Sequence, residues 1–151
     1  MSDTREKNFE LMIVEIMHTA NLLELEFAAI LKSYELTTAQ YNILRILRGA
    51  SPAQLGVGEI RNRMISASSD VSRLIDRLVS KELVVREVCE KNRRKMDVYI
   101  SEKGLDVLKQ LDILVADLLK GMDSEALADN EVLRLTDSLK HIRESINNSK
   151  K

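Results

Sequence analysis

Apolar residues recur every three or four positions along most of the chain, and this spacing places them on one side of an α-helix. Short polar or glycine-containing stretches interrupt the pattern and mark the helix ends. The pattern predicts helices over residues 3–34, 38–47, 56–64, 69–81, 105–121 and 129–147. The sequence therefore indicates a mainly α-helical protein.

Residues 83–88 and 96–101 have a different pattern. The first segment is rich in β-branched side chains, and in the second apolar and other residues alternate, as expected of two β-strands. The segment between them, 89–95, carries four positive charges and, apart from Cys89, no apolar side chain. These segments predict a small β-hairpin with a basic tip. Two short helices followed by such a hairpin form a winged helix-turn-helix, which we expect over residues 38–103.

The first and last helices have more apolar surface than one small domain is expected to cover. The helix within residues 1–34 is apolar almost around its circumference, and such a helix needs burial on nearly all sides. We expect a single domain over residues 1–151, in which 1–34 and 105–147 form dimerisation helices. The candidate interface residues are Phe9, Ile13, Leu114, Leu118, Leu139 and Ile142.

Charge is unevenly distributed, although 23 basic and 24 acidic residues give a net charge of only −1. Residues 61–95 carry ten basic and five acidic side chains, so this segment is +5 and the rest of the chain is −6. A basic segment in an acidic protein indicates a surface that binds a polyanion. The alternative is a solvated face on which cations cluster by chance.

The polar face of the predicted helix 69–81 suits the major groove of DNA. Small polar side chains let the helix backbone approach the bases, and arginine can form two hydrogen bonds to guanine. The hairpin tip would meet the neighbouring minor groove, whose negative potential attracts arginine. For Arg73 the alternative is an ion pair with Asp70 or Asp76, and for Arg94 it is a solvated loop. The candidate DNA-binding residues are Ser68, Ser69, Asp70, Ser72, Arg73, Arg77, Lys91, Arg93, Arg94 and Lys95.

The sequence lacks the motifs of an enzyme or a metal site. It has no glycine-rich phosphate loop and no nucleophile elbow, and its two histidines, His18 and His141, stand alone. We therefore predict no catalytic site, no metal and no cofactor. No apolar run is long enough to span a membrane and the N-terminus is charged, so we expect a cytoplasmic protein without a membrane partner.

Cys89 is the one cysteine of the chain, so no internal disulfide is expected. Its cationic neighbours in the hairpin tip could activate the thiol for a redox role. The alternative is a small buried filler at the end of a strand, and we favour this second interpretation.

Three sequence segments occur together in a recognisable order. They are 36–44 (LTTAQYNIL), 70–78 (DVSRLIDRL) and 86–104, in which 92–94 (NRR) and 100–104 (ISEKG) fit a wing and its exit. In these segments, and over nearly its whole length, the chain resembles the multiple antibiotic resistance regulator (MarR) family of winged-helix transcription factors. The resemblance implies a homodimer whose terminal helices interlock and whose two winged domains bind a palindromic operator in double-stranded DNA. It also implies a repressor that a small-molecule effector releases.

Two positions depart from the family pattern. Asn92 stands where an aspartate usually precedes the wing arginines, so neutral hydrogen bonds of its amide would have to replace a carboxylate. Glu82 stands where a glycine usually follows the recognition helix, and a left-handed backbone is less favourable for a residue with a side chain. Neither departure removes a candidate DNA contact.

The sequence thus predicts a dimeric, sequence-specific DNA-binding transcriptional regulator rather than an enzyme. The alternative is a winged-helix module that binds another protein and has no specific DNA site. The +5 segment favours DNA.

Overall fold

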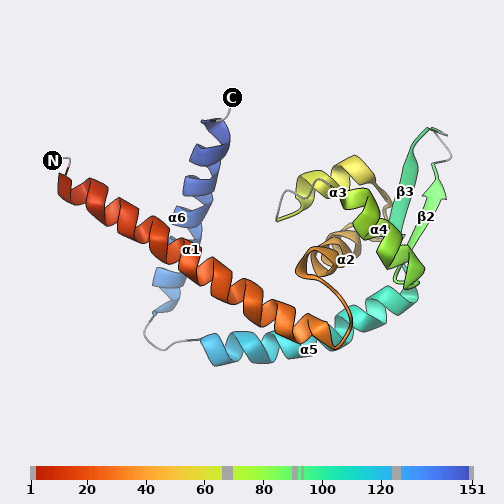
Figure 1. The fold of residues 1–151 in the computed structure, drawn as a ribbon, viewed down its shortest axis with the longest axis horizontal. Coiled ribbons are helices and arrows are strands. Elements are labelled where there is room, and N and C mark those ends of the chain that lie inside the picture. Colours follow the sequence, from red (N-terminus) through yellow and green to blue (C-terminus); the bar gives the residue numbers. More distant parts are fainter. Residues whose placement is uncertain (1–2, 66–69, 90–91, 93, 124–126, 150–151) are drawn as a thin grey trace. The chain divides into compact units, whose positions relative to one another are not determined.

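A computed structural model of the protein describes residues 3–65, 70–89, 92, 94–123 and 127–149. The predicted helices and both hairpin strands are confirmed, with ends that shift by a few residues (Figure 1). The elements are α1 (Asp3–Lys32), α2 (Thr38–Ala50), β1 (Leu55–Gly56), α3 (Val57–Arg63), α4 (Val71–Ser80), β2 (Val84–Val88), β3 (Met96–Ile100), α5 (Glu102–Met122) and α6 (Asp129–Asn148).

Two compact units make up the chain, one of residues 1–116 and one of residues 117–151. The boundary lies within α5, so the expected dimerisation segment 105–147 spans both units. The first unit contains the complete helix-turn-helix and hairpin region. In the second unit, α6 has no buried residue.

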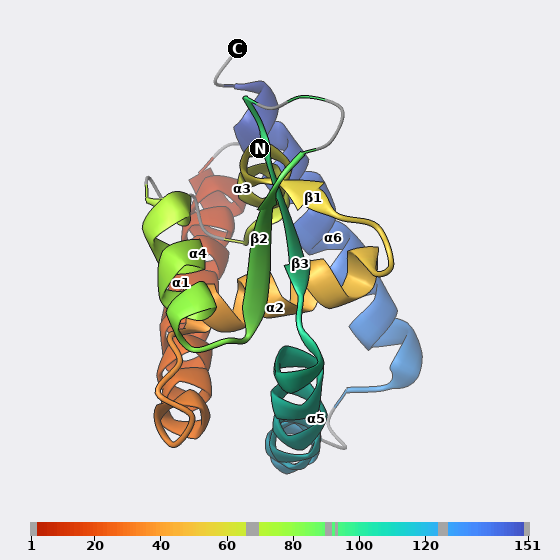
Figure 2. The same cartoon turned by 90° about the vertical axis from the view of Figure 1, so that its right-hand side faces the viewer.

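The small sheet is antiparallel and has the strand order β1-β3-β2 (Figure 2). Within the hairpin, Val84 lies opposite Ile100 and Val88 lies opposite Met96. The two-residue strand β1 adds to the other edge of β3, where Leu55 pairs with Val98. The sequence pattern predicted the hairpin and missed β1, because two residues are too few to show an alternation.

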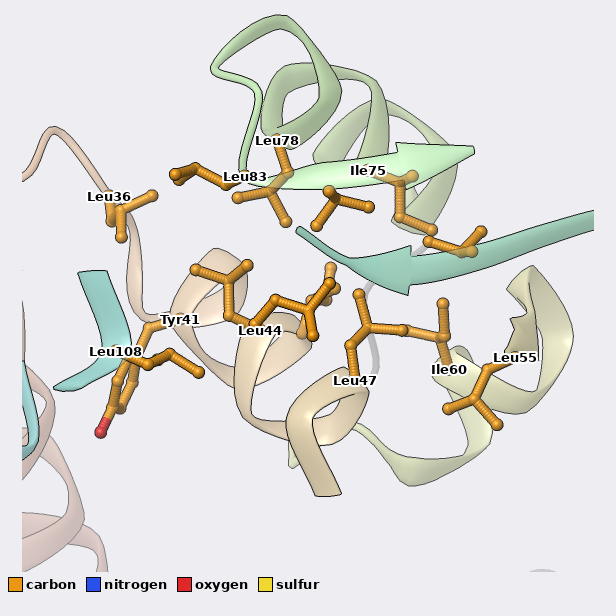
Figure 3. Packing of buried hydrophobic residues seen from close by; sticks show 14 of the residues in the cluster. Leu36, Tyr41, Leu44, Leu47, Leu55, Ile60, Ile75, Leu78, Leu83 and Leu108 are labelled. Atoms are coloured by element: carbon orange, nitrogen blue, oxygen red, sulfur yellow. The ribbon is translucent and has the colours of Figure 1, made fainter. Parts of the chain in front are cut away.

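The hydrophobic core joins α2, α4 and the hairpin. Leu44 and Leu47 of α2 are at most 1% exposed, and Ile75 and Leu78 of α4 are fully buried against them (Figure 3). Val79 is at helical spacing from Ile75 but is 36% exposed. It lies about 80° around the helix from the fully buried Val71, at about 100° per residue, and therefore sits at the edge of the buried face.

The junction below the hairpin is packed backbone against backbone. A Cβ atom on Gly104 would lie 2.3 Å from the carbonyl oxygen of Leu83, so only glycine fits at this position without a shift. The Ser101 hydroxyl accepts a hydrogen bond from the Gly104 amide at 3.0 Å and donates one to the carbonyl of Glu82 at 2.7 Å. Glu82 has a φ of 62°, which confirms the left-handed backbone considered for it. The start of α5 is thereby fixed to the residues that follow α4.

Candidate nucleic-acid interface

Helix α4 begins later than predicted because Asp70 caps it. The Asp70 carboxylate accepts a hydrogen bond from the backbone amide of Arg73 at 3.3 Å, which satisfies one of the free amides of the first turn. Ser72 is half-buried, and Arg73 and Arg77 are exposed on the face opposite the core. The candidate contacts Ser68 and Ser69 lie outside the described residues.

Arg73 also forms the ion pair that was considered for it. Its Nε lies 3.1 Å from Oδ2 of Asp70, and the two side chains are 80% and 47% exposed. An exposed pair of this kind contributes only about 0.2–1 kcal/mol. Arg73 can therefore exchange Asp70 for a stronger acceptor, and a direct role of Asp70 in DNA contact would compete with its role as a cap.

A second ion pair connects α4 to the hairpin. The Arg86 guanidinium on β2 lies 2.7 Å from the Asp76 carboxylate, and the Arg86 side chain is 28% exposed. The Nε atom of Arg86 is buried and has no hydrogen-bond partner among the described residues. This pair orients the wing relative to α4. This pair was not predicted from the sequence. The only sign of it in the sequence is that α4 carries an acidic residue, Asp76, and the following strand a basic one, Arg86.

Backbone and side-chain hydrogen bonds close the wing tip. The Cys89 amide donates to the carbonyl of Lys95 at 3.0 Å, and the Lys95 amide donates to the carbonyl of Asn92 at 2.8 Å. The Asn92 side-chain oxygen accepts a hydrogen bond from the Arg94 amide at 3.1 Å. A neutral amide thus organises the turn, as considered for this position. The candidate contacts Lys91 and Arg93 lie outside the described residues.

A cross-strand contact lies further down the hairpin. The Tyr99 hydroxyl donates a hydrogen bond to a carboxylate oxygen of Glu87 at 2.9 Å. This bond raises the pKa of Tyr99 above its ordinary value, because the bond stabilises the protonated phenol and the neighbouring negative charge opposes ionisation. The two side chains stabilise the pairing of β2 with β3.

The structure brings the wing and α4 together around one hollow of about 620 Å³. Ser72 lines it from α4, while Arg94 and Lys95 line it from the wing. Cys89 also lines the hollow and is half-buried, which fits the filler interpretation only in part. Arg86 is a third cation in the lining, and the carboxylates of Glu59 and Asp97 line the same hollow. Ser72 of α4 thus shares one concave, solvent-exposed surface with three cations and two carboxylates.

The six candidate interface residues all lie outside the core. Phe9, Leu114 and Leu139 are 54%, 39% and 40% exposed, and Ile13, Leu118 and Ile142 are half-buried. Further large apolar side chains are exposed on the same helices, among them Met17 of α1 and Leu133 of α6, both 67% exposed. Apolar surface on this scale is typical of an interaction surface.

Two helices packed against each other, α3 and α4, and the hairpin that follows them define a winged helix-turn-helix protein. Residues 36–96, which run from just before α2 to the first residue of β3, match the model of the MarR family. Together with the relatives and solved structures described next, this match identifies the winged helix-turn-helix region of the chain as similar to that of MarR-family regulators.

Relatives are found among both sequences and structures. The chain is 28% identical over 109 residues to the HTH-type transcriptional regulator MhqR of Bacillus subtilis (strain 168), across 71% of this chain and 72% of MhqR. It shares the fold of AbsC, a MarR family transcriptional regulator from Streptomyces coelicolor, with a TM-score of 0.80, 22% identity, and 98% and 97% of the two chains covered. A mutant MarR from E. coli complexed with operator DNA has a TM-score of 0.74 and 26% identity, with 89% and 96% covered.

The proteins of the MarR family are transcription regulators and not enzymes. Within the described part of the chain, no group of three or more His, Cys, Asp or Glu side chains could hold a metal ion. None of the helices in the described ranges is both long and apolar enough to cross a membrane.

Proposed function

We propose that the protein is a dimeric, sequence-specific DNA-binding transcriptional regulator that acts as a repressor on a palindromic operator. The observation that carries the proposal is the concave surface that Ser72 of α4 lines together with Arg94 and Lys95 of the wing. This surface belongs to the +5 segment of an otherwise acidic chain. The solved E. coli complex supports it, because that relative of the same fold is bound to operator DNA.

In this proposal α4 enters the major groove and the wing enters the adjacent minor groove. Arg73 and Arg77 project from the exposed face of α4, where they can reach guanine edges or phosphates. Ser72 is small enough to let the helix approach the bases. Arg94 and Lys95, with the remaining wing candidates, contact phosphates and the minor groove.

The dimer is proposed from the apolar surfaces of α1, α5 and α6. Permanent dimers bury roughly 2,000 Å² or more, and we expect an interface above this size. Analytical ultracentrifugation at micromolar concentration should therefore give twice the 17.2 kDa mass of the chain. A well-folded monomer would contradict both the dimer and the palindromic operator.

Release by a small-molecule effector is proposed from the family resemblance. A regulator of this kind reads chromosomal DNA, so we place it in the cytoplasm. A compound that binds the free protein more tightly than the DNA-bound form must weaken operator binding. Compounds that bind the protein are found by the rise they cause in its melting temperature, and each is then tested for release of the operator. If none of the compounds that bind weakens DNA binding, this part of the proposal is contradicted.

DNA binding itself is tested by gel shift with genomic fragments at two salt concentrations. A sequence-specific regulator retains a preferred fragment at the higher salt concentration, whereas phosphate contacts alone weaken on all fragments together. Equally weak binding to every fragment would favour the alternative, a winged-helix module that binds another protein.

A further inference from the structure

The C-terminal end of α4 is held by a charged pair on one side. Lys81 is the C-cap residue of α4, and its Nζ donates a hydrogen bond to a carboxylate oxygen of Glu35 at 2.8 Å. Glu35 lies in the turn after α1 and has a φ of 51°. The turn that leaves α1 thus contacts the end of the helix that is proposed to read DNA.

The next residue holds the same helix end on another side. Glu82 accepts a hydrogen bond from Nζ of Lys103 at 2.8 Å, and Lys103 lies in the first turn of α5. The carbonyl of Glu82 also accepts the hydroxyl of Ser101, just before α5. The chain passes directly from the end of α4 into β2, and β3 leads directly into α5, so these contacts lie at the base of the hairpin (Figure 2).

The carboxylates of Glu35 and Glu82 are both stabilised in their charged form by a lysine. The hydrogen bond and the positive charge of Lys81 hold the pKa of Glu35 below its ordinary value, and those of Lys103 do the same for Glu82. Both ion pairs are therefore present at neutral pH. Each pair is exposed and weak by itself, but they act on adjacent residues and would be repeated in the second subunit of the proposed dimer.

A third pair links the body of the winged domain to α5. The Arg48 guanidinium of α2 contacts both carboxylate oxygens of Asp112, at 2.6 Å and 3.3 Å. The hydrogen bond to Asp112 raises the pKa of Arg48 above its already high ordinary value. The winged domain is thus tied to α5 at two separate places.

We propose that Lys81 and Glu82 are positioning residues, which hold α4 at a fixed angle to α1 and α5. The inference rests on the proposed function, because α1 and α5 carry the proposed dimer interface. In a dimer these residues would then fix the separation between the two copies of α4. Their effect would be selectivity for the spacing of the two operator half-sites.

The dimensions of α4 make such an effect measurable. Its ten residues span about 15 Å, so a tilt of about 10° at the C-terminal end moves the N-terminal turn by about 2.6 Å. One base pair of DNA rises about 3.4 Å. A loosened helix end therefore reduces the cost of binding half-sites that are one base pair out of place, although it does not offset the accompanying rotation of about 35°.

The test uses the double variant Glu35→Gln with Glu82→Gln. Both substitutions remove negative charge, so electrostatics alone would strengthen binding to all DNA, whereas loss of positioning reduces selectivity for spacing. The matched control is Asp106→Asn, because Asp106 pairs with Lys109 at 3.2 Å within α5 and links no second element. Circular dichroism and sedimentation first establish that each variant is folded and has the same oligomeric state as the wild type.

Binding is measured on three duplexes derived from one selected from a random library. They are the selected duplex, the same duplex with one base pair inserted between its half-sites, and a single half-site. We expect the ratio of the first two dissociation constants to fall about three- to tenfold in the double variant, with single half-site affinity unchanged or slightly higher. The control should keep the wild-type ratio. Exchange of the charges by Glu82→Lys with Lys103→Glu should restore most of the selectivity that Glu82→Gln alone loses.

Three results would overturn the inference. The first is an unchanged ratio of the two dissociation constants in the double variant. The second is an equal fall of this ratio in the Asp106→Asn control. The third is a loss of affinity for the single half-site as large as the loss for the selected duplex. A wild-type protein that prefers no duplex would instead refute the proposed function, and the inference with it. A wild-type protein that discriminates spacing, beside a double variant that does so equally well, would refute the inference alone.

Discussion

Replacement of Arg73 by alanine should weaken operator binding strongly and leave the stability of the protein nearly unchanged. The side chain is 80% exposed, and its ion pair with Asp70 spans three residues on the helix surface. An exposed pair of this kind contributes about 0.2–1 kcal/mol, so the free energy of unfolding should change by no more than this. An arginine that reads guanine is worth about 1–3 kcal/mol in each half-site.

A dimer doubles the cost to about 2–6 kcal/mol, which corresponds to a loss of affinity between about 30-fold and 10⁴-fold. In the wild type, Arg73 must leave Asp70 before it can bind DNA. The free energy that this separation costs is smaller than the loss of about 2–6 kcal/mol, so the order of magnitude of the expected loss stays the same. Because the lost contact reads a base, preference at one position of each half-site should also relax.

The assay is a titration of wild type and variant on the operator and on operators substituted at single positions, at several salt concentrations. The control is Arg143→Ala, which removes the same charge from an exposed position on α6. Unchanged operator affinity in the Arg73 variant would refute this role and move base reading to Ser72 and the serines before α4. Weaker binding with unchanged base preference would make Arg73 a phosphate contact.

The remaining predictions concern the wing and its base. Arg94→Ala should reduce the slope of log affinity against log salt by about one unit per lost phosphate contact, hence about two units in a dimer, and an unchanged slope would mean that Arg94 is a solvated loop residue. Gly104→Ala should destabilise the protein by about 1–3 kcal/mol, because its Cβ meets the Leu83 carbonyl, and an unchanged midpoint in urea would contradict the close packing. Cys89→Ser should retain DNA binding, whereas a peroxide-induced release of DNA that the substitution abolishes would assign the thiol a redox role.

The fold was largely predictable because its elements are encoded by local patterns. Apolar residues at helical spacing predicted the six helices of the described residues, and the β-branched segment 83–88 and the alternating segment 96–101 predicted both hairpin strands. The capping box that starts α2 is local as well, since Thr37 and Gln40 bond to each other's backbone amides. The edge strand β1 was missed because its pairing with β3 depends on residues far apart in the sequence.

The site was predictable in composition and less so in geometry. Charge counting selected α4 and the wing, and the structure places Ser72 beside the wing cations. The ion pair between Asp76 and Arg86 could not be assigned from sequence, because it requires the packing of β2 against α4. The contact between Glu35 and Lys81 joins residues 46 positions apart, and no periodic pattern links positions at that distance.

Selection of bound duplexes from a random DNA library tests most directly that the protein is a dimeric, sequence-specific DNA-binding regulator. We predict enrichment of an inverted repeat whose half-sites are centred about 10 base pairs, or a multiple of this, apart, because two symmetric copies of α4 enter successive major grooves. The enriched sequence should retain its advantage over scrambled DNA as salt is raised. A folded protein that enriches no sequence, or only a single unrepeated site, would contradict this function.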